Sequence, residues 1–148
     1  MGAAIGSISG GYYSGKLISK GNTVNKARKT AIVIGAAIMF LGLVAAILFA
    51  NTPLKFVIMA AFVLFGFQFT IGNIQTLPSD LFSGKSVGSL ARIGGSIAVF
   101  AVIIMNFLVP VISQKSFVPI FMMFAVFVPL GVLAIYTFAK NIAPVEKN

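Results

Sequence analysis

The feature that most constrains this chain is its series of long apolar segments, of which residues 30–50 are the clearest. No Asp, Glu, Lys or Arg interrupts that segment. It is long enough to supply the roughly 20 apolar residues with which an α-helix crosses a hydrocarbon core of about 30 Å. Three more segments, each with at most one charged residue, follow at 54–77, 87–112 and 117–139. We therefore predict an all-α integral membrane fold with four transmembrane helices.

Polar stretches separate these segments. The first of these stretches ends the helix predicted over 30–50, since Pro53 cannot continue a hydrogen-bonded helix. Residues 16–29 and 78–86 are predicted to form cytoplasmic loops, and 140–148 a cytoplasmic tail. Residues 1–15 are too short to span a membrane and lack the Leu-rich core of a signal peptide. We interpret them as the end of a fifth helix whose beginning is missing.

Glycines recur at every fourth position within this first stretch. Gly2, Gly6 and Gly10 form the small-xxx-small pattern that is typical of closely packed membrane helices. The pattern predicts that this helix end lies against another helix.

The positive charge of the chain is unevenly placed. The net charge is +9 at pH 7. Just before the first long apolar segment stand five basic residues, Lys16, Lys20, Lys26, Arg28 and Lys29. If that loop is cytoplasmic, only Lys55 and Lys115 of the 11 basic residues fall outside, in agreement with the positive-inside rule. We predict a multi-pass protein of the inner (plasma) membrane with a cytoplasmic C-terminus. Topology and contact with anionic lipid account for the charge, so we expect no nucleic-acid partner.

The sequence holds few of the side chains on which enzymes depend. Cysteine and histidine are absent, and the only carboxylate side chains are those of Asp80 and Glu146. Acid–base catalysis needs positioned titratable groups, and zinc sites usually need Cys or His. We therefore predict that the chain is not an enzyme, and we expect no catalytic residue, no metal site and no cofactor.

Two blocks of sequence carry a resemblance to a known family. The first comprises 6–15 and 20–30, and the second comprises Gln68, Asn73, 79–82, Lys85, 87–89 and 94–95. In this order and separation they resemble the hexuronate transporters of the anion:cation symporter family, within the major facilitator superfamily. The resemblance covers nearly the whole chain.

The resemblance implies the C-terminal part of a twelve-helix major facilitator fold, from the tail of helix eight to helix twelve. Such transporters have two six-helix halves around a central site and work by alternating access. The implied function is proton-coupled uptake of glucuronate, galacturonate or a related sugar acid. The implied partners are the lipid bilayer, the sugar acid, the proton and the missing N-terminal half.

The resemblance also assigns candidate site residues. Gln68 and Asn73 match positions of the tenth helix and would hydrogen-bond sugar hydroxyls. Ser96, in the facing eleventh helix, is a weaker candidate, and Arg92 a further one for attracting the anionic substrate. Asp80 and Lys85 are assigned to gating or loop contacts.

Each of these residues also has a structural interpretation. Amides in membrane spans often hydrogen-bond across helices. Gln68 and Asn73 are five residues apart, so they point about 140° from one another on an ideal helix. Arg92 can extend to the interface or pair with Asp80, and Asp80 can cap a helix.

The chain departs from the family pattern after Gly95, where residues 96–100 replace the usual glycine-rich run, and at three further positions. Phe67 and Thr70 stand where relatives often have Trp or His around Gln68, which leaves the cavity wall and the sugar preference open. Gly15 stands where superfamily loops commonly have Asp, so the charge interactions of that loop are incomplete.

Two other interpretations remain. The chain can be a small stand-alone multispan protein that oligomerises, as an exporter or a scaffold, or a non-functional truncation. The short first stretch, 1–15, argues against a stand-alone protein, as does the lack of a membrane-embedded Asp or Glu to couple protons.

Overall fold

Every regular element of the chain that the structure describes is an α-helix. The computed structural model describes residues 1–82, 85–114, 116–139 and 142. Its helices are α1 (Gly2–Ser19), α2 (Val24–Phe49), α3 (Pro53–Gln75), α4 (Leu77–Leu81), α5 (Lys85–Ile112) and α6 (Val118–Phe138). Four helices are long and apolar enough to cross a membrane, at Val24–Phe49, Pro53–Leu81, Ser86–Ile112 and Val118–Phe138. The predicted helical class and its four membrane-length helices are therefore confirmed.

The loop predicted over 16–29 is much shorter than expected. α1 continues to Ser19, and α2 already begins at Val24. The backbone of Gly21 takes a φ of 87°, which suits glycine, and the Thr23 side chain accepts a hydrogen bond from the backbone N–H of Lys26 at 3.3 Å. The prediction failed because basic residues mark the edge of the apolar span and not the end of the helix. The cations therefore lie mainly on helical turns.

The connection predicted over 78–86 is also partly helical. α3 ends at Gln75, and the five-residue helix α4 follows with Pro78 in its first turn, where a missing N–H does no harm. Residues 83–84 of this connection lie outside the described residues. So does the predicted tail 140–148, except for the buried Ile142.

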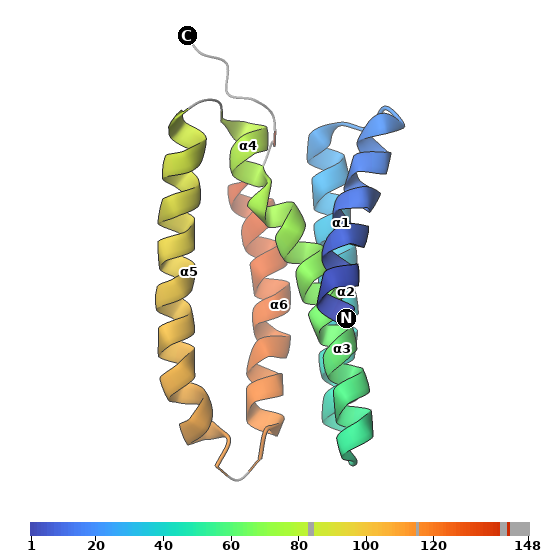
Figure 1. Ribbon diagram of the computed structural model, residues 1–148, viewed down its shortest axis with the longest axis vertical. Helices are drawn as coiled ribbons and strands as arrows, with labels where there is room; N and C mark the ends of the chain where they lie inside the picture. Colours follow the sequence, from blue (N-terminus) through green and yellow to red (C-terminus); the bar gives the residue numbers. More distant parts are fainter. Residues whose placement is uncertain (83–84, 115, 140–141, 143–148) are drawn as a thin grey trace.

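The first three helices form the packed part of the molecule, and α6 packs against α2 (Figure 1). Most of the buried apolar side chains of this core are on α2, including Ile32 and Leu43. By contrast, α5 lies at one edge of the molecule, and its few main contacts are with α4 and α6 (Figure 1). None of its described side chains is buried.

Backbone contact between α1 and α3 runs through the predicted glycine stripe. A Cβ atom added at Gly2 would lie 2.6 Å from the carbonyl oxygen of Ala61, and one added at Gly10 would lie 2.6 Å from that of Phe69. A Cβ atom at Gly6 would meet the carbonyl oxygen of Phe65 in the same way. The glycines of α1 recur every four residues, and so do the residues of α3 that they contact. The ridge of glycines on α1 therefore fits along one ridge of α3. This close approach confirms the predicted role of the stripe.

A neighbouring face of α3 meets α2 through a second set of glycines. A Cβ atom on Gly35 would lie 2.9 Å from the backbone nitrogen of Thr70, and one on Gly66 would lie 2.8 Å from the Cα of Met39. Lipid tails are as apolar as the side chains, so close van der Waals packing largely replaces the hydrophobic effect between membrane helices. α3 is thus held on two sides by contacts that only glycine permits.

The glycine stripe gives a first testable prediction. Gly6→Ala should lower the free energy of unfolding by about 1–3 kcal/mol relative to Gly11→Ala, because the new methyl group overpacks the contact with Phe65. Gly11 is the matched control, since it lies on the same helix and has nothing within 4 Å of an added Cβ. The measurement is unfolding in mixed detergent micelles, followed by circular dichroism. Equal stability of the two variants would refute this account of the α1–α3 contact.

Candidate functional site

A cluster of polar side chains joins four helices at the end where α1 connects to α2. Arg28 of α2 donates from Nε to Asp80 Oδ2 of α4 at 2.8 Å. Its Nη1 donates to Ser14 Oγ of α1 at 2.9 Å and to Asn73 Oδ1 of α3 at 3.3 Å. One guanidinium therefore contacts three helices besides its own. We call Arg28, Asp80, Ser14 and Asn73 the Arg28 cluster.

The helical positions explain why the cluster forms. Ser14 lies four residues after Gly10 and so extends the glycine stripe, while Asn73 lies four residues after Phe69 and extends the facing ridge of α3. Both side chains are fully buried. The Arg28 and Asp80 side chains are 14% and 18% exposed, so bulk water screens their attraction only partly.

The structure places Asn73 within this cluster, away from open space. Its Nδ2 donates to the carbonyl oxygens of Phe69 at 2.9 Å and Gly10 at 3.2 Å. Its Oδ1 accepts from Arg28. With both amide hydrogens and the oxygen engaged, Asn73 has the contacts of a link between helices, and in this arrangement it presents no donor to a sugar hydroxyl.

Gln68 does not join Asn73 in one site. The two residues point about 140° apart on α3, as an ideal helix requires for a separation of five residues. Gln68 is half-buried, and no hydrogen bond to its side chain is found among the described residues. Its amide is therefore available for a ligand or for a neighbouring helix.

The remaining candidates lie on α5. Arg92 and Ser96 are exposed, and at a spacing of four residues they share one face of the helix. Asp80 pairs with Arg28 and not with Arg92. Lys85 begins α5, but its side chain lies outside the described part of the chain. The structure thus separates the substrate candidates onto two helices that do not pack against each other.

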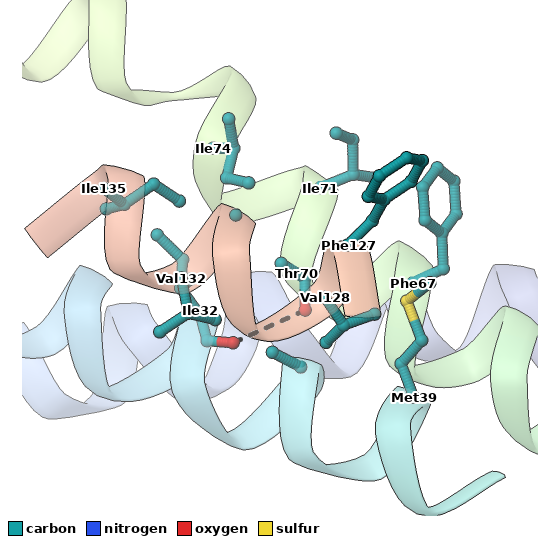
Figure 2. A pocket seen from close by; sticks show the side chains of 12 residues that line it. Ile32, Met39, Phe67, Thr70, Ile71, Ile74, Phe127, Val128, Val132 and Ile135 are labelled. Atoms are coloured by element: carbon teal, nitrogen blue, oxygen red, sulfur yellow. Dashed lines mark hydrogen bonds between the residues drawn. The ribbon is translucent and has the colours of Figure 1, made fainter. Parts of the chain in front are cut away.

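An apolar groove opens among α2, α3 and α6 (Figure 2). Its volume is about 350 Å³, and its wall includes Ile32, Phe127 and Val132. The one side-chain hydroxyl in the wall, that of Thr70, donates to the carbonyl oxygen of Ile32 at 3.5 Å (Figure 2). A carboxylate or a sugar hydroxyl would lose its hydration here without compensation, so this groove suits hydrocarbon and not a sugar acid.

Neither substrate candidate on α3 lines this groove. Its wall instead includes Phe67 and Thr70, the two positions near Gln68 at which the sequence differs from the pattern that it otherwise resembles. The departures therefore affect an apolar surface between helices.

Sequence reasoning missed the Arg28 cluster. Arg28 was assigned to membrane orientation together with its four basic neighbours, and Ser14 to no role at all. One signal was present in the sequence, because Asp80 is the only acidic residue near a span and so limits the partners of any interfacial cation. Four-residue spacing from Gly10 would have placed Ser14 on the contact face. Comparison with known proteins adds no further constraint, because no family model, curated protein or solved structure matches the chain.

The Arg28–Asp80 pair gives a second prediction. Asp80→Asn should lower the free energy of unfolding by about 2 kcal/mol, because it removes a charge-assisted hydrogen bond from a partly buried site. Asp80→Asn combined with Arg28→Gln should cost less than the sum of the single changes, with a coupling energy of about 1 kcal/mol. The control cycle pairs Asp80→Asn with Lys26→Gln, an exposed cation of α2, and should be additive. Additive behaviour in both cycles would contradict the pairing.

Proposed function

We propose that this chain is the C-terminal part of a major facilitator transporter of the hexuronate type within the anion:cation symporter family. In this proposal the complete protein moves glucuronate, galacturonate or a related sugar acid together with a proton, by alternating access. The two sequence blocks that resemble the family support the assignment. The helical fold with four membrane-length helices is compatible with it.

The observation that carries the proposal is that α5 is exposed and yet has polar residues on one face. This membrane-length helix has no buried side chain among those described, yet one of its faces bears Arg92 and Ser96. Charged residues within membrane-spanning helices almost always face the interior of a bundle or a water-filled cavity. A helix of this kind fits the wall of a central cavity whose other wall is a second half of the protein.

The candidate side chains on α5 and α3 have functional groups that suit an anionic sugar. The guanidinium of Arg92 can form two parallel hydrogen bonds with a carboxylate. Ser96 lies one turn further along and offers a hydroxyl to the sugar ring. Gln68, on α3, is a second amide donor and acceptor that the described residues leave unengaged. We assign Arg92 to the carboxylate and Gln68 and Ser96 to hydroxyls.

The Arg28 cluster has a mechanical role in this proposal. It fastens α1, α2, α3 and α4 together at one end, so these helices are expected to move as one body while α5 faces the cavity. Asp80 thereby supplies the loop contact, and the proton is carried by groups of the N-terminal half.

The distribution of charge supports a cytoplasmic location for this end. The α1–α2 connection, α4 and the beginning of α5 lie together at one end of the molecule (Figure 1). Lys16, Lys20, Lys26 and Lys29 join Arg28 there, whereas Lys55 begins α3 at the other end. We propose that the protein lies in the inner (plasma) membrane with the basic end, and hence the C-terminus, in the cytoplasm.

A stand-alone oligomer is the second candidate, because a second copy of the chain can also cover α5. In that case purified chain alone would form a complete transport unit. The uptake experiment below separates the two.

The proposed function is tested by uptake of radiolabelled glucuronate. Membrane vesicles that hold the native polypeptide should show saturable uptake that a protonophore abolishes. Arg92→Gln should raise the KM about tenfold, because a charge-assisted contact to the carboxylate is lost. Lys55→Gln is the control, since this exposed cation lies at the opposite end of the bundle and should leave uptake unchanged.

Proteoliposomes that contain only this chain complete the test. They should take up no more glucuronate than empty liposomes under the same pH gradient. Saturable uptake by the chain alone would overturn the two-half proposal in favour of the oligomer. Native vesicles that take up neither glucuronate nor galacturonate would overturn the hexuronate assignment itself.

A further inference from the structure

A second apolar groove lies between α2 and α6. Its volume is about 390 Å³, and it runs from Val33 and Tyr136 at one end to Phe40 and Val128 at the other. Together with the groove of Figure 2 it flanks the line where α6 meets α2, because Ala36 and Val132 line both. α6 is therefore bordered by hydrocarbon-lined channels on both sides.

The length and lining of the second groove indicate what can lie along it. Val33 and Phe40 are seven residues apart, which is roughly 10 Å along a helix at 1.5 Å per residue. The groove is lined almost entirely by apolar side chains, so an acyl chain laid along it would contact hydrocarbon over this length.

A cation stands at one end of this groove. Lys29 Nζ lies 5.0 Å from the centre of the Tyr136 ring, and that ring lines the groove. Lys29 is one helical turn before Val33, so both belong to the same face of α2. Lys26, three residues before Lys29, follows the same face. Arg28 precedes Lys29 in the sequence and turns toward Asp80.

The combination of charge and shape identifies one class of ligand. We propose that the α2–α6 groove binds an anionic phospholipid, with one acyl chain along the groove and the phosphate beside Lys29 and Lys26. Tyr136 lies near the end of α6, and a tyrosine near the end of a membrane-length helix is typical of the membrane interface, where its ring contacts lipid at the headgroup level. The bound lipid would bridge α2 and α6, and α6 has its principal contact with α2 alone. The proposal does not depend on the transport function.

Lipid binding is measured by native mass spectrometry of the full chain during titration with phosphatidylglycerol or phosphatidylcholine of the same acyl composition. Phosphatidylglycerol should bind more tightly. Lys29→Gln should raise its Kd about fivefold, the effect expected for one cation near an anionic headgroup. Lys20→Gln removes the same charge from the end of α1, away from the groove, and should leave the Kd nearly unchanged. Equal effects of both variants would show diffuse attraction and overturn the site.

The acyl chain is tested separately with Ala37→Phe. Ala37 is an exposed residue that lines the groove, so a phenyl group there fills the channel without entering the core. Binding of both phospholipids should weaken several-fold. Ala98→Phe, on the exposed surface of α5, is the matched control and should bind both lipids as the parent chain does. Unchanged binding to Ala37→Phe would overturn the proposal and leave the groove to another occupant.

Discussion

The close backbone contact of α3 with α1 on one face and with α2 on a neighbouring face is the constraint on which the rest of the structure depends. Burial of apolar surface cannot drive helices together in lipid, because the tails that surround them are equally apolar. Gly6 and Gly10 bring α1 onto α3, and Gly35 and Gly66 bring α2 onto a neighbouring face of it. These contacts fix the three helices relative to one another before any polar group is considered.

The Arg28 cluster follows from this packing. Asn73 can reach the carbonyl oxygen of Gly10 only because the two backbones approach so closely, and Ser14 extends the same ridge to meet Arg28. Asp80 then neutralises the guanidinium at the end of the bundle. By contrast, an added Cβ atom at Gly88, Gly94 or Gly95 of α5 would meet nothing within 4 Å, and this helix stands at the edge of the molecule. Close packing through small residues therefore explains why α1, α2 and α3 form one tightly packed unit and why α5 is exposed.

The sequence predicted the helices because hydropathy and length are local properties. The four membrane-length segments and the contact role of Gly2, Gly6 and Gly10 were predicted without the structure. The helix ends near 16–29 were wrong because charge marks the membrane boundary and not the last hydrogen bond of the helix. The partners of Arg28 and Asn73 could not be predicted, since they depend on how three helices are rotated about their axes. Both transport and the identity of the sugar acid stay predictions.

The central claim is that this four-helix arrangement belongs to a larger two-half protein. It is tested most directly by the size of the native polypeptide, detected in its source membrane with an antibody against residues 140–148. A two-half transporter predicts a species of about three times the 15.6 kDa of this chain. A single species at 15.6 kDa would contradict the claim, because α5 would then have to be covered by something other than the remainder of its own chain.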